Sequence, residues 1–348
     1  MNRRRWLAGA VIAAAAGHGG LWYARRRAAD IQWMEPGPAG MRYRKFGRTG
    51  LEVSETGFGS WGIGGSYGAT GKRDSLDALA RAEELGCNFV DSAAVYGDAE
   101  VTLGEYLQGR RDRWIVATKF SGQDAGMTAT LESQLRNLRT GAVDLYQLHW
   151  VPKEPVLYEE LAKLKQSGKT RFIGVSLYTA ADIDFVLDRP EIDAIQLAFS
   201  LLDPDPFLSR VHAIHEAGKA VIVRSALREG FLTGKFKRDQ RFTDPTDQRH
   251  ELDAEQIANL VDQVEQFRFL EQDAGSMVVA AARYPLSFAD VSTVILGTKS
   301  ARQADSNFGQ VPGGTLGSRS LERVREMQVE LGLGSRWRRA LRRWHLAS

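Results

Sequence analysis

Residues 88–100 read NFVDSAAVYGDAE, a short apolar run that ends on Asp91 and leads into a loop that carries Tyr96. Comparable runs recur along the chain, with a first strand ending near 57–59 and later ones at 114–120, 143–150, 171–176, 192–200, 220–225 and 291–298. Amphipathic segments separate them, and most close on a glycine that is typical of helix ends. Eight strands that alternate with helices predict an α/β fold, a closed (β/α)8 TIM barrel.

Two details refine this architecture. Residues 41–59 predict a β-hairpin that turns at 48–50 and closes the bottom of the barrel. The barrel domain is expected to span residues 41–333, with one long loop at 228–251 after the seventh strand. A doubly wound sheet is the alternative, but no GxGxxG fingerprint follows the first strand.

The charge of the chain is unevenly distributed. The formal net charge is +3, yet residues 1–30 hold six arginines and residues 335–348 hold five. The segment 31–334 keeps 35 basic and 42 acidic residues, a net charge of −7. An acidic body argues against nucleic acid as a partner, and the basic ends favour an anionic membrane surface. The single cysteine, Cys87, excludes a disulfide framework within the chain and a cysteine-based zinc site.

The first 30 residues resemble a bacterial twin-arginine signal or a membrane anchor. Residues 2–7 are NRRRWL, and the apolar run 6–16 has the length of a signal h-region. Continued to residue 24, the run reaches 19 residues, enough to cross a bilayer. Four basic residues between 42 and 48 favour a body in the cytoplasm. We expect attachment to the cytoplasmic face of the inner membrane or export by the twin-arginine route; a cytoplasmic protein with a basic extension is the alternative.

The last 15 residues, 334–348, form a basic amphipathic tail. Trp337, Leu341 and Trp344 recur at helical spacing with arginines between them. This pattern is typical of an interfacial helix, and equally of a terminal helix that packs on the barrel through its tryptophans. The sequence favours no oligomeric state.

Polar residues end or follow three of the predicted strands, namely Asp91, Tyr96, Lys119 and His149. In a TIM barrel the carboxyl ends of the strands form the active-site face. An ammonium close to a phenol stabilises the phenolate and lowers the phenol pKa, while a carboxylate compensates a buried lysine. A histidine beside them can hydrogen-bond a carbonyl oxygen. The set suits protonation of an oxygen while a hydride reaches its carbon.

Residues 41 to about 310 resemble the aldo-keto reductase family, because DSAAVYG, ATKF and LHW match its motifs in order and spacing. The resemblance implies reduction of a small-molecule aldehyde or ketone with NADPH, and less favourably with NADH. Tyr96 would donate the proton, and His149 would orient the substrate. Lys119 and Asp91 would adjust the pKa of the Tyr96 phenol. The cofactor would lie extended across the barrel rim.

The resemblance also implies a set of cofactor contacts. Ser176 in GVSLY and Gln196 in IQLAFS match residues that bind the carboxamide. The remaining matches fall in a phosphate loop and at the adenosine end: Ser225, Leu227, Gly230, Lys235, Gly297, Lys299, Ser300, Gln303 and Asn307. The cationic Lys299 beside Ser300 suits a 2′-phosphate, which favours NADP over NAD.

The sequence departs from the family pattern at two positions. Leu177 stands where the family commonly has asparagine, and Arg224 where it commonly has an aromatic residue that stacks on the nicotinamide. The planar guanidinium of Arg224 could stack there instead. Trp61 and Trp150, together with the 228–251 loop, are the candidates for the substrate pocket.

Two further interpretations concern metals and an alternative role. His212 and His215 share a helix face without a carboxylate or cysteine at ligand spacing, so no metal site is expected. The alternative to an enzyme is a membrane-associated, NADPH-binding regulatory subunit with little turnover, because potassium-channel β subunits resemble this fold.

Overall fold

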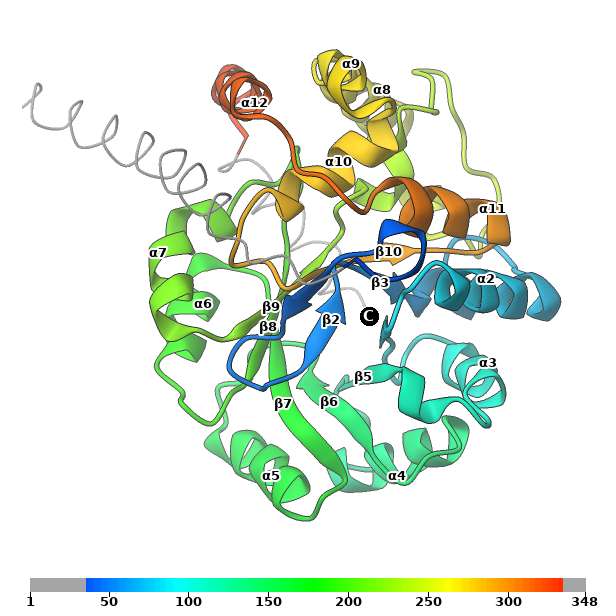
Figure 1. The fold of residues 1–348 in the computed structure, drawn as a ribbon, viewed down its shortest axis with the longest axis vertical. Helices are drawn as coiled ribbons and strands as arrows, with labels where there is room; N and C mark the ends of the chain where they lie inside the picture. The colour runs from blue at the N-terminus through cyan, green and yellow to red at the C-terminus, as the bar shows by residue number, and fades with distance from the viewer. Residues whose placement is uncertain (1–35, 334–348) are drawn as a thin grey trace, which may run out of the picture.

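The computed structural model describes residues 36–333, and within them eight parallel strands close into a barrel (Figure 1). Their order around the barrel is β10-β3-β4-β5-β6-β7-β8-β9. The strands are β3 Thr56–Gly59, β4 Phe89–Asp91, β5 Ile115–Phe120, β6 Val143–Leu148, β7 Thr170–Leu177, β8 Ala194–Ala198, β9 Ala220–Arg224 and β10 Thr293–Gly297. Each coincides with one of the predicted apolar runs, and the (β/α)8 prediction is confirmed.

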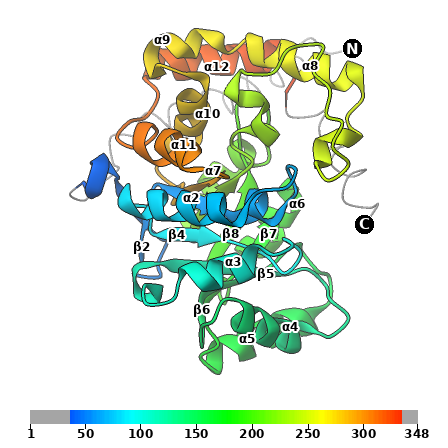
Figure 2. The ribbon, with the colours of Figure 1, turned by 90° about the vertical axis from the view of Figure 1, so that its right-hand side faces the viewer.

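Helices surround the barrel in the ring that Figure 1 shows. They are α2 Lys72–Glu84, α3 Ala99–Tyr106, α4 Met127–Asn137, α5 Pro155–Gln166, α6 Ala180–Leu187, α7 Phe207–Ala217, α8 Ala254–Glu265, α9 Glu271–Ala274, α10 Met277–Leu286, α11 Ala301–Ala304 and α12 Ser318–Glu330. In both views α8, α9 and α12 lie together on one side of the barrel (Figures 1 and 2).

Shorter helical turns join these elements. They are the 3₁₀ segments η1 Pro38–Gly40, η2 Ser60–Gly64, η3 Arg111–Arg113, η4 Arg228–Thr233, η5 Gln248–Glu251 and η6 Arg268–Leu270, and the π-helical turn η7 Asp305–Gln310. Two of them, η4 and η5, lie within the predicted 228–251 loop, which is therefore more ordered than the sequence indicates.

Burial explains why these segments adopt their structures. All six residues of β6 and all five of β8 are buried, as expected for strands covered on both faces. In α2 the buried residues are Ser75, Ala78, Leu79 and Ala82, the spacing of one helix face turned to the barrel.

A β-hairpin closes the amino end of the barrel, as predicted. Strand β1 (Tyr43–Lys45) pairs antiparallel with β2 (Glu52–Ser54), and the Phe46 amide donates to the Leu51 carbonyl at 2.8 Å across the turn. Phe46 and Val53 are fully buried in one cluster with residues at the starts of the barrel strands, such as Phe89 and Ala220. The hairpin therefore fills the end of the barrel opposite the predicted active face.

Arg44 fixes this hairpin to the barrel wall. Its guanidinium is buried, donates to the carbonyls of Leu286 (2.6 Å) and Val291 (2.9 Å), and pairs with Glu55 at 3.6 Å. Burial lowers the pKa of Arg44 to about 10, so the group remains charged at neutral pH. A buried charge held in this way makes the position of the hairpin specific.

The predicted signal or anchor at 1–30 and the basic tail at 334–348 lie outside the described residues. Among residues 36–333, none of the helices combines the length and apolar character needed to span a bilayer. Contact of the two ends with a membrane, and export, stay predictions.

The hairpin turn offers a matched pair of substitutions. Gly47 and Gly50 have φ of +53° and +77°, so alanine is strained at both positions. A Cβ on Gly47 would lie 2.3 Å from the Ala220 nitrogen, whereas one on Gly50 would meet nothing within 4 Å. We expect Gly47→Ala to lower the free energy of unfolding by about 3 kcal/mol and Gly50→Ala by about 1 kcal/mol. Urea denaturation measures both, and equal losses would contradict the close approach of hairpin and barrel.

Candidate active site

A cleft of about 1710 Å³ opens at the carboxyl ends of the strands. Small-molecule pockets usually measure roughly 300–1,000 Å³, so this cleft has room for an extended cofactor together with a substrate. The predicted site residues that line it are Trp61, Asp91, Tyr96, His149, Trp150, Gln196, Arg224, Ser225, Leu227, Gly230, Lys235, Gly297, Lys299, Gln303 and Asn307. Lys119 and Ser176 are fully buried behind its wall.

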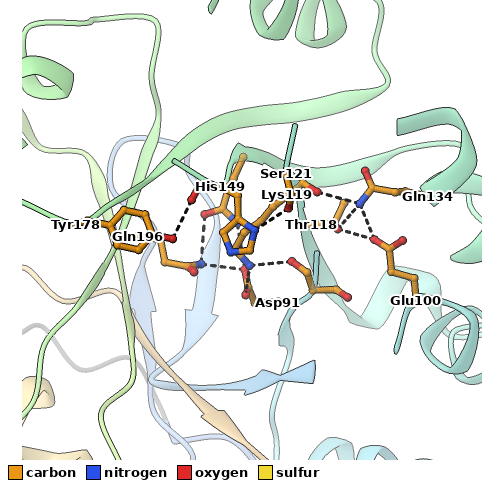
Figure 3. Close-up of polar contacts among 11 residues, drawn as sticks. Asp91, Glu100, Thr118, Lys119, Ser121, Gln134, His149, Tyr178 and Gln196 are labelled. Atoms are coloured by element: carbon orange, nitrogen blue, oxygen red, sulfur yellow. Dashed lines mark hydrogen bonds and ion pairs between the residues drawn. The ribbon is translucent and has the colours of Figure 1, made fainter. Parts of the chain in front are cut away.

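Beneath the cleft lies a buried ion pair between Asp91, the last residue of β4, and Lys119 of β5 (Figure 3). The side chains are 1% and 0% exposed, so neither charge is solvated by bulk water. The Lys119 ammonium also donates to the Ser92 carbonyl at 2.8 Å. The other carboxylate oxygen of Asp91 accepts from the amides of Gln196 (2.9 Å) and Gln147 (3.1 Å). These partners offset the cost of burying both charges.

The phenol ring of Tyr96 lies over this ion pair. Its centroid is 5.1 Å from the Lys119 ammonium nitrogen and 4.5 Å from the ring centroid of Trp61, whose plane is perpendicular. The imidazole of His149 is 5.8 Å away, centroid to centroid. The structure therefore brings Asp91, Tyr96, Lys119 and His149 together on one rim, as the strand-end positions predict.

The predicted effect of Lys119 on Tyr96 is wrong in its net direction. The pKa of Tyr96 is raised well above its ordinary value of 10, first by burial and then by the negative charge of Asp91. Burial also lowers the pKa of Lys119. The physical reason is chiefly the burial of the phenol, which disfavours the charged phenolate, and the carboxylate of Asp91 adds to this effect.

Two residues that the sequence reading did not single out hold His149. Its Nδ1 is 2.7 Å from the Ser121 hydroxyl, and its backbone carbonyl accepts from the Tyr178 hydroxyl at 3.0 Å (Figure 3). Ser121 follows β5 directly and Tyr178 follows β7 directly. Because both residues directly follow a barrel strand, their positions in the sequence could have predicted that they lie at the active-site face.

A second buried network supports β5 from behind. The Glu100 carboxylate of α3 accepts from the Thr118 hydroxyl (2.6 Å) and the Gln134 amide (2.7 Å) (Figure 3). The same amide donates to the Lys119 carbonyl at 3.1 Å. Burial raises the pKa of Glu100. Nothing in its local sequence marks Glu100, because its partners come from a strand and a helix further along the chain.

The sequence profile of the Aldo/keto reductase family matches residues 55–328. The chain belongs to this family. It is 30% identical over 222 residues to aldo-keto reductase YhdN of Bacillus subtilis, covering 58% of this chain and 67% of YhdN. It is 30% identical over 291 residues to aldo-keto reductase str7 of Strobilurus tenacellus, covering 76% and 86%. The solved holo form of aldo-keto reductase AKR11C1 from Bacillus halodurans superposes with a TM-score of 0.69 at 27% identity, covering 82% of this chain and 96% of that one. The protein is thus an NAD(P)H-dependent oxidoreductase.

Three features of this aldo/keto reductase fit a nicotinamide dinucleotide. The Ser176 hydroxyl is fully buried, and within residues 36–333 it has no hydrogen-bond partner, so it can serve a bound amide. In the loop after β9, Ser225, Arg228 and Glu229 all have positive φ, of 58°, 46° and 49°. Such strain in non-glycine residues is typical of ligand-binding loops. The size of the cleft is the third feature.

The predicted adenosine end is only partly as expected. The Lys299 ammonium donates to the carbonyls of Tyr67 (2.7 Å) and Gly68 (3.0 Å), and burial lowers its pKa. The Ser300 hydroxyl accepts a hydrogen bond from the backbone N–H of Gln303 and so caps the amino end of α11. Ser300 does not line the cleft. Arg302, which the sequence reading did not single out, does line it.

Arg224 contacts two residues at the end of β7, and its predicted contact with the nicotinamide stays a prediction. Its guanidinium carbon lies 4.6 Å from the ring centroid of Tyr178, and Nη2 donates to the Leu177 carbonyl at 3.2 Å. The guanidinium therefore lies against a protein side chain. Among residues 36–333, no group of three or more His, Cys, Asp or Glu side chains is placed to bind a metal ion.

Removal of one partner of the buried Asp91–Lys119 pair should destabilise the fold. Asp91→Asn keeps the shape of the side chain but leaves the Lys119 ammonium buried without its counter-charge. We expect the free energy of unfolding to fall by about 3–5 kcal/mol. The double variant Asp91→Asn/Lys119→Met removes both charges and should recover most of that loss. Guanidinium denaturation of the single and double variants checks this, and a single variant as stable as wild type would be inconsistent with the pair.

Proposed function

We propose that this oxidoreductase reduces an aldehyde or ketone to an alcohol with NADPH, and that Tyr96 is the proton donor. The observation that carries the proposal is the meeting of the Tyr96 phenol and the His149 imidazole over a buried ion pair, in a cleft large enough for two ligands. When bound, the nicotinamide supplies the hydride.

Each side chain has a distinct part in this reaction. The raised pKa of Tyr96 keeps the phenol protonated at neutral pH, so the proton is in place when negative charge develops on the substrate oxygen. His149, held at Nδ1 by Ser121, orients the carbonyl. The Asp91–Lys119 pair supports the Tyr96 ring and excludes water below it.

The cofactor would be held by groups spread along the cleft. Ser176 would bind the carboxamide, and the strained loop 225–230 the pyrophosphate. Lys299 and Arg302 would provide positive charge for a 2′-phosphate, which favours NADPH. Trp61 and Trp150 line the same cleft and remain the candidates for substrate contact.

The central test is Tyr96→Phe, which removes the proton donor and keeps the ring. We expect NADPH-dependent reduction across a panel of aldehydes and ketones to fall at least about 100-fold. Cofactor affinity, followed by quenching of tryptophan fluorescence, should not change. Turnover within a few-fold of wild type would refute the role of Tyr96. Tight NADPH binding by the wild type without measurable reduction of any carbonyl would instead indicate a nucleotide-sensing protein.

Cofactor preference is tested at Lys299. We expect Lys299→Met to lower the ratio of NADPH to NADH affinity about tenfold, because a charged hydrogen bond to phosphate is lost. Lys237→Met is the matched control, since Lys237 is exposed and outside the cleft lining. An unchanged ratio in the Lys299 variant would exclude this residue from 2′-phosphate recognition.

A further inference from the structure

Ser121 and His149 are the residues that follow two paired strands. Strands β5 and β6 run parallel, and their last residues, Phe120 and Leu148, are register partners. The pairing continues one step further, because the His149 N–H donates to the Phe120 carbonyl at 2.9 Å. Side chains alternate between the two faces of a strand, so Ser121 shares its face with Lys119, two residues before it. The fold therefore places the Ser121 hydroxyl beside the His149 imidazole.

This placement joins the hydroxyl to one nitrogen of the ring. Ser121 Oγ lies 2.7 Å from His149 Nδ1, a hydrogen-bond distance (Figure 3). The main chain of Ser121 is fixed as well, because its N–H donates to the side-chain oxygen of Gln123 at 3.0 Å. The main chain of His149 is held by Phe120 and by the Tyr178 hydroxyl, which donates to the His149 carbonyl at 3.0 Å. The contact between hydroxyl and imidazole thus joins two anchored residues.

The hydrogen between Ser121 Oγ and His149 Nδ1 can belong to either atom. If the hydroxyl donates, the hydrogen of the neutral ring lies on Nε2; if Nδ1 donates, Nε2 carries none. In the second case the serine hydrogen needs another acceptor. Among residues 36–333, the only hydrogen-bond partner of the Ser121 hydroxyl is Nδ1 of His149. Donation by the hydroxyl is therefore the arrangement in which its hydrogen has an acceptor within the described protein.

The charged groups near the imidazole are directed elsewhere. The titratable and charged side chains around it are Asp91, Tyr96, Lys119, Tyr178 and Arg224. Lys119 pairs with Asp91, and the Tyr178 hydroxyl binds a carbonyl and not the ring. Arg224 donates to the Leu177 carbonyl, and the Tyr96 ring meets the imidazole edge-on at 5.8 Å between centroids. Ser121 is thus the residue of this group that bonds to Nδ1.

We propose that Ser121 is a positioning residue that keeps the hydrogen of neutral His149 on Nε2. The inference rests on the proposed function. Because Nδ1 faces Ser121, Nε2 is the nitrogen that would donate to the carbonyl oxygen, and without its hydrogen it would repel that oxygen. In the reaction a hydride reaches the carbonyl carbon and the Tyr96 proton moves to the oxygen, which leaves a phenolate. His149 donates a hydrogen bond in this step and transfers no proton, and Ser121 acts through the imidazole.

The first test is the ¹⁵N NMR spectrum of the histidine side chains in the full chain at about pH 8, well above the ordinary histidine pKa of about 6.5. His149→Asn identifies the His149 signals among the six histidines. Protonated and unprotonated ring nitrogens resonate far apart, so the spectrum reports the tautomer directly. We expect a protonated Nε2 and an unprotonated Nδ1 in the wild type. Signals averaged between the two tautomers are expected in Ser121→Ala.

The second test is the pH dependence of kcat/KM for carbonyl reduction. At about pH 8, Ser121→Ala should lower kcat/KM about tenfold, the equivalent of one hydrogen bond. Below the pKa of His149, which the NMR titration of the variant gives, the imidazolium carries a hydrogen on both nitrogens. The loss should therefore shrink to about twofold there. NADPH affinity should be unchanged at both pH values.

Two control variants isolate the hydroxyl. Ser121→Thr keeps the donor and should keep both the tautomer and the rate. Tyr178→Phe removes the other hydroxyl that binds His149, at its carbonyl and not at its ring. It should leave the ring-nitrogen signals as they are in the wild type. Ser121→Gly takes the place of Ser121→Ala if the alanine variant does not fold.

The outcomes separate this inference from the proposed function. The NMR spectrum needs no turnover, so a wild type that reduces no carbonyl would overturn the proposed function while the tautomer is still measured. A wild type with its hydrogen on Nδ1, or a Ser121→Ala spectrum identical to that of the wild type, would overturn the inference alone. A loss of rate that is equal at every pH would also overturn it, and would assign Ser121 a role in folding only.

Discussion

The buried ion pair between Asp91 and Lys119 is the constraint around which the rest of the site is organised. Two charges removed from water must be compensated completely, and here a strand end, a neighbouring strand and two glutamine amides provide that compensation. The pair forms the floor on which the Tyr96 ring lies. Burial of the phenol above this floor, together with the negative charge of Asp91, raises the pKa of Tyr96.

The main features of the fold and of the catalytic rim follow from sequence. Apolar runs alternate with amphipathic segments, and burial on both faces of strands such as β6 makes that signal strong. Asp91 and Lys119 could be assigned to one rim because strand ends in a barrel share a face. This reasoning needs only the register of each residue in its own strand.

Properties that depend on distant partners could not be predicted in the same way. The sequence predicts that Asp91 pairs with Lys119, and the structure has this ion pair, but the sequence does not show that burial outweighs the effect of the ammonium on Tyr96. The hydroxyl of Ser300 was expected at the cofactor, yet it caps the helix that it precedes. Glu100 could not be predicted because its role arises from contacts with a strand and a helix further along the chain. The net electrostatic effect on a buried group depends on its whole surroundings, which short motifs do not contain.

The β-hairpin at the amino end of the barrel has a consequence for how such a protein diversifies. The amino end of the barrel is closed by the side chains of Arg44, Phe46 and Val53, whereas the reactive groups lie at the opposite end. Loops around the mouth can change length and composition during evolution without disturbing the residues that seal the scaffold. New substrate preferences can therefore arise at little risk to folding, which is one physical basis for broad chemical divergence on a constant framework.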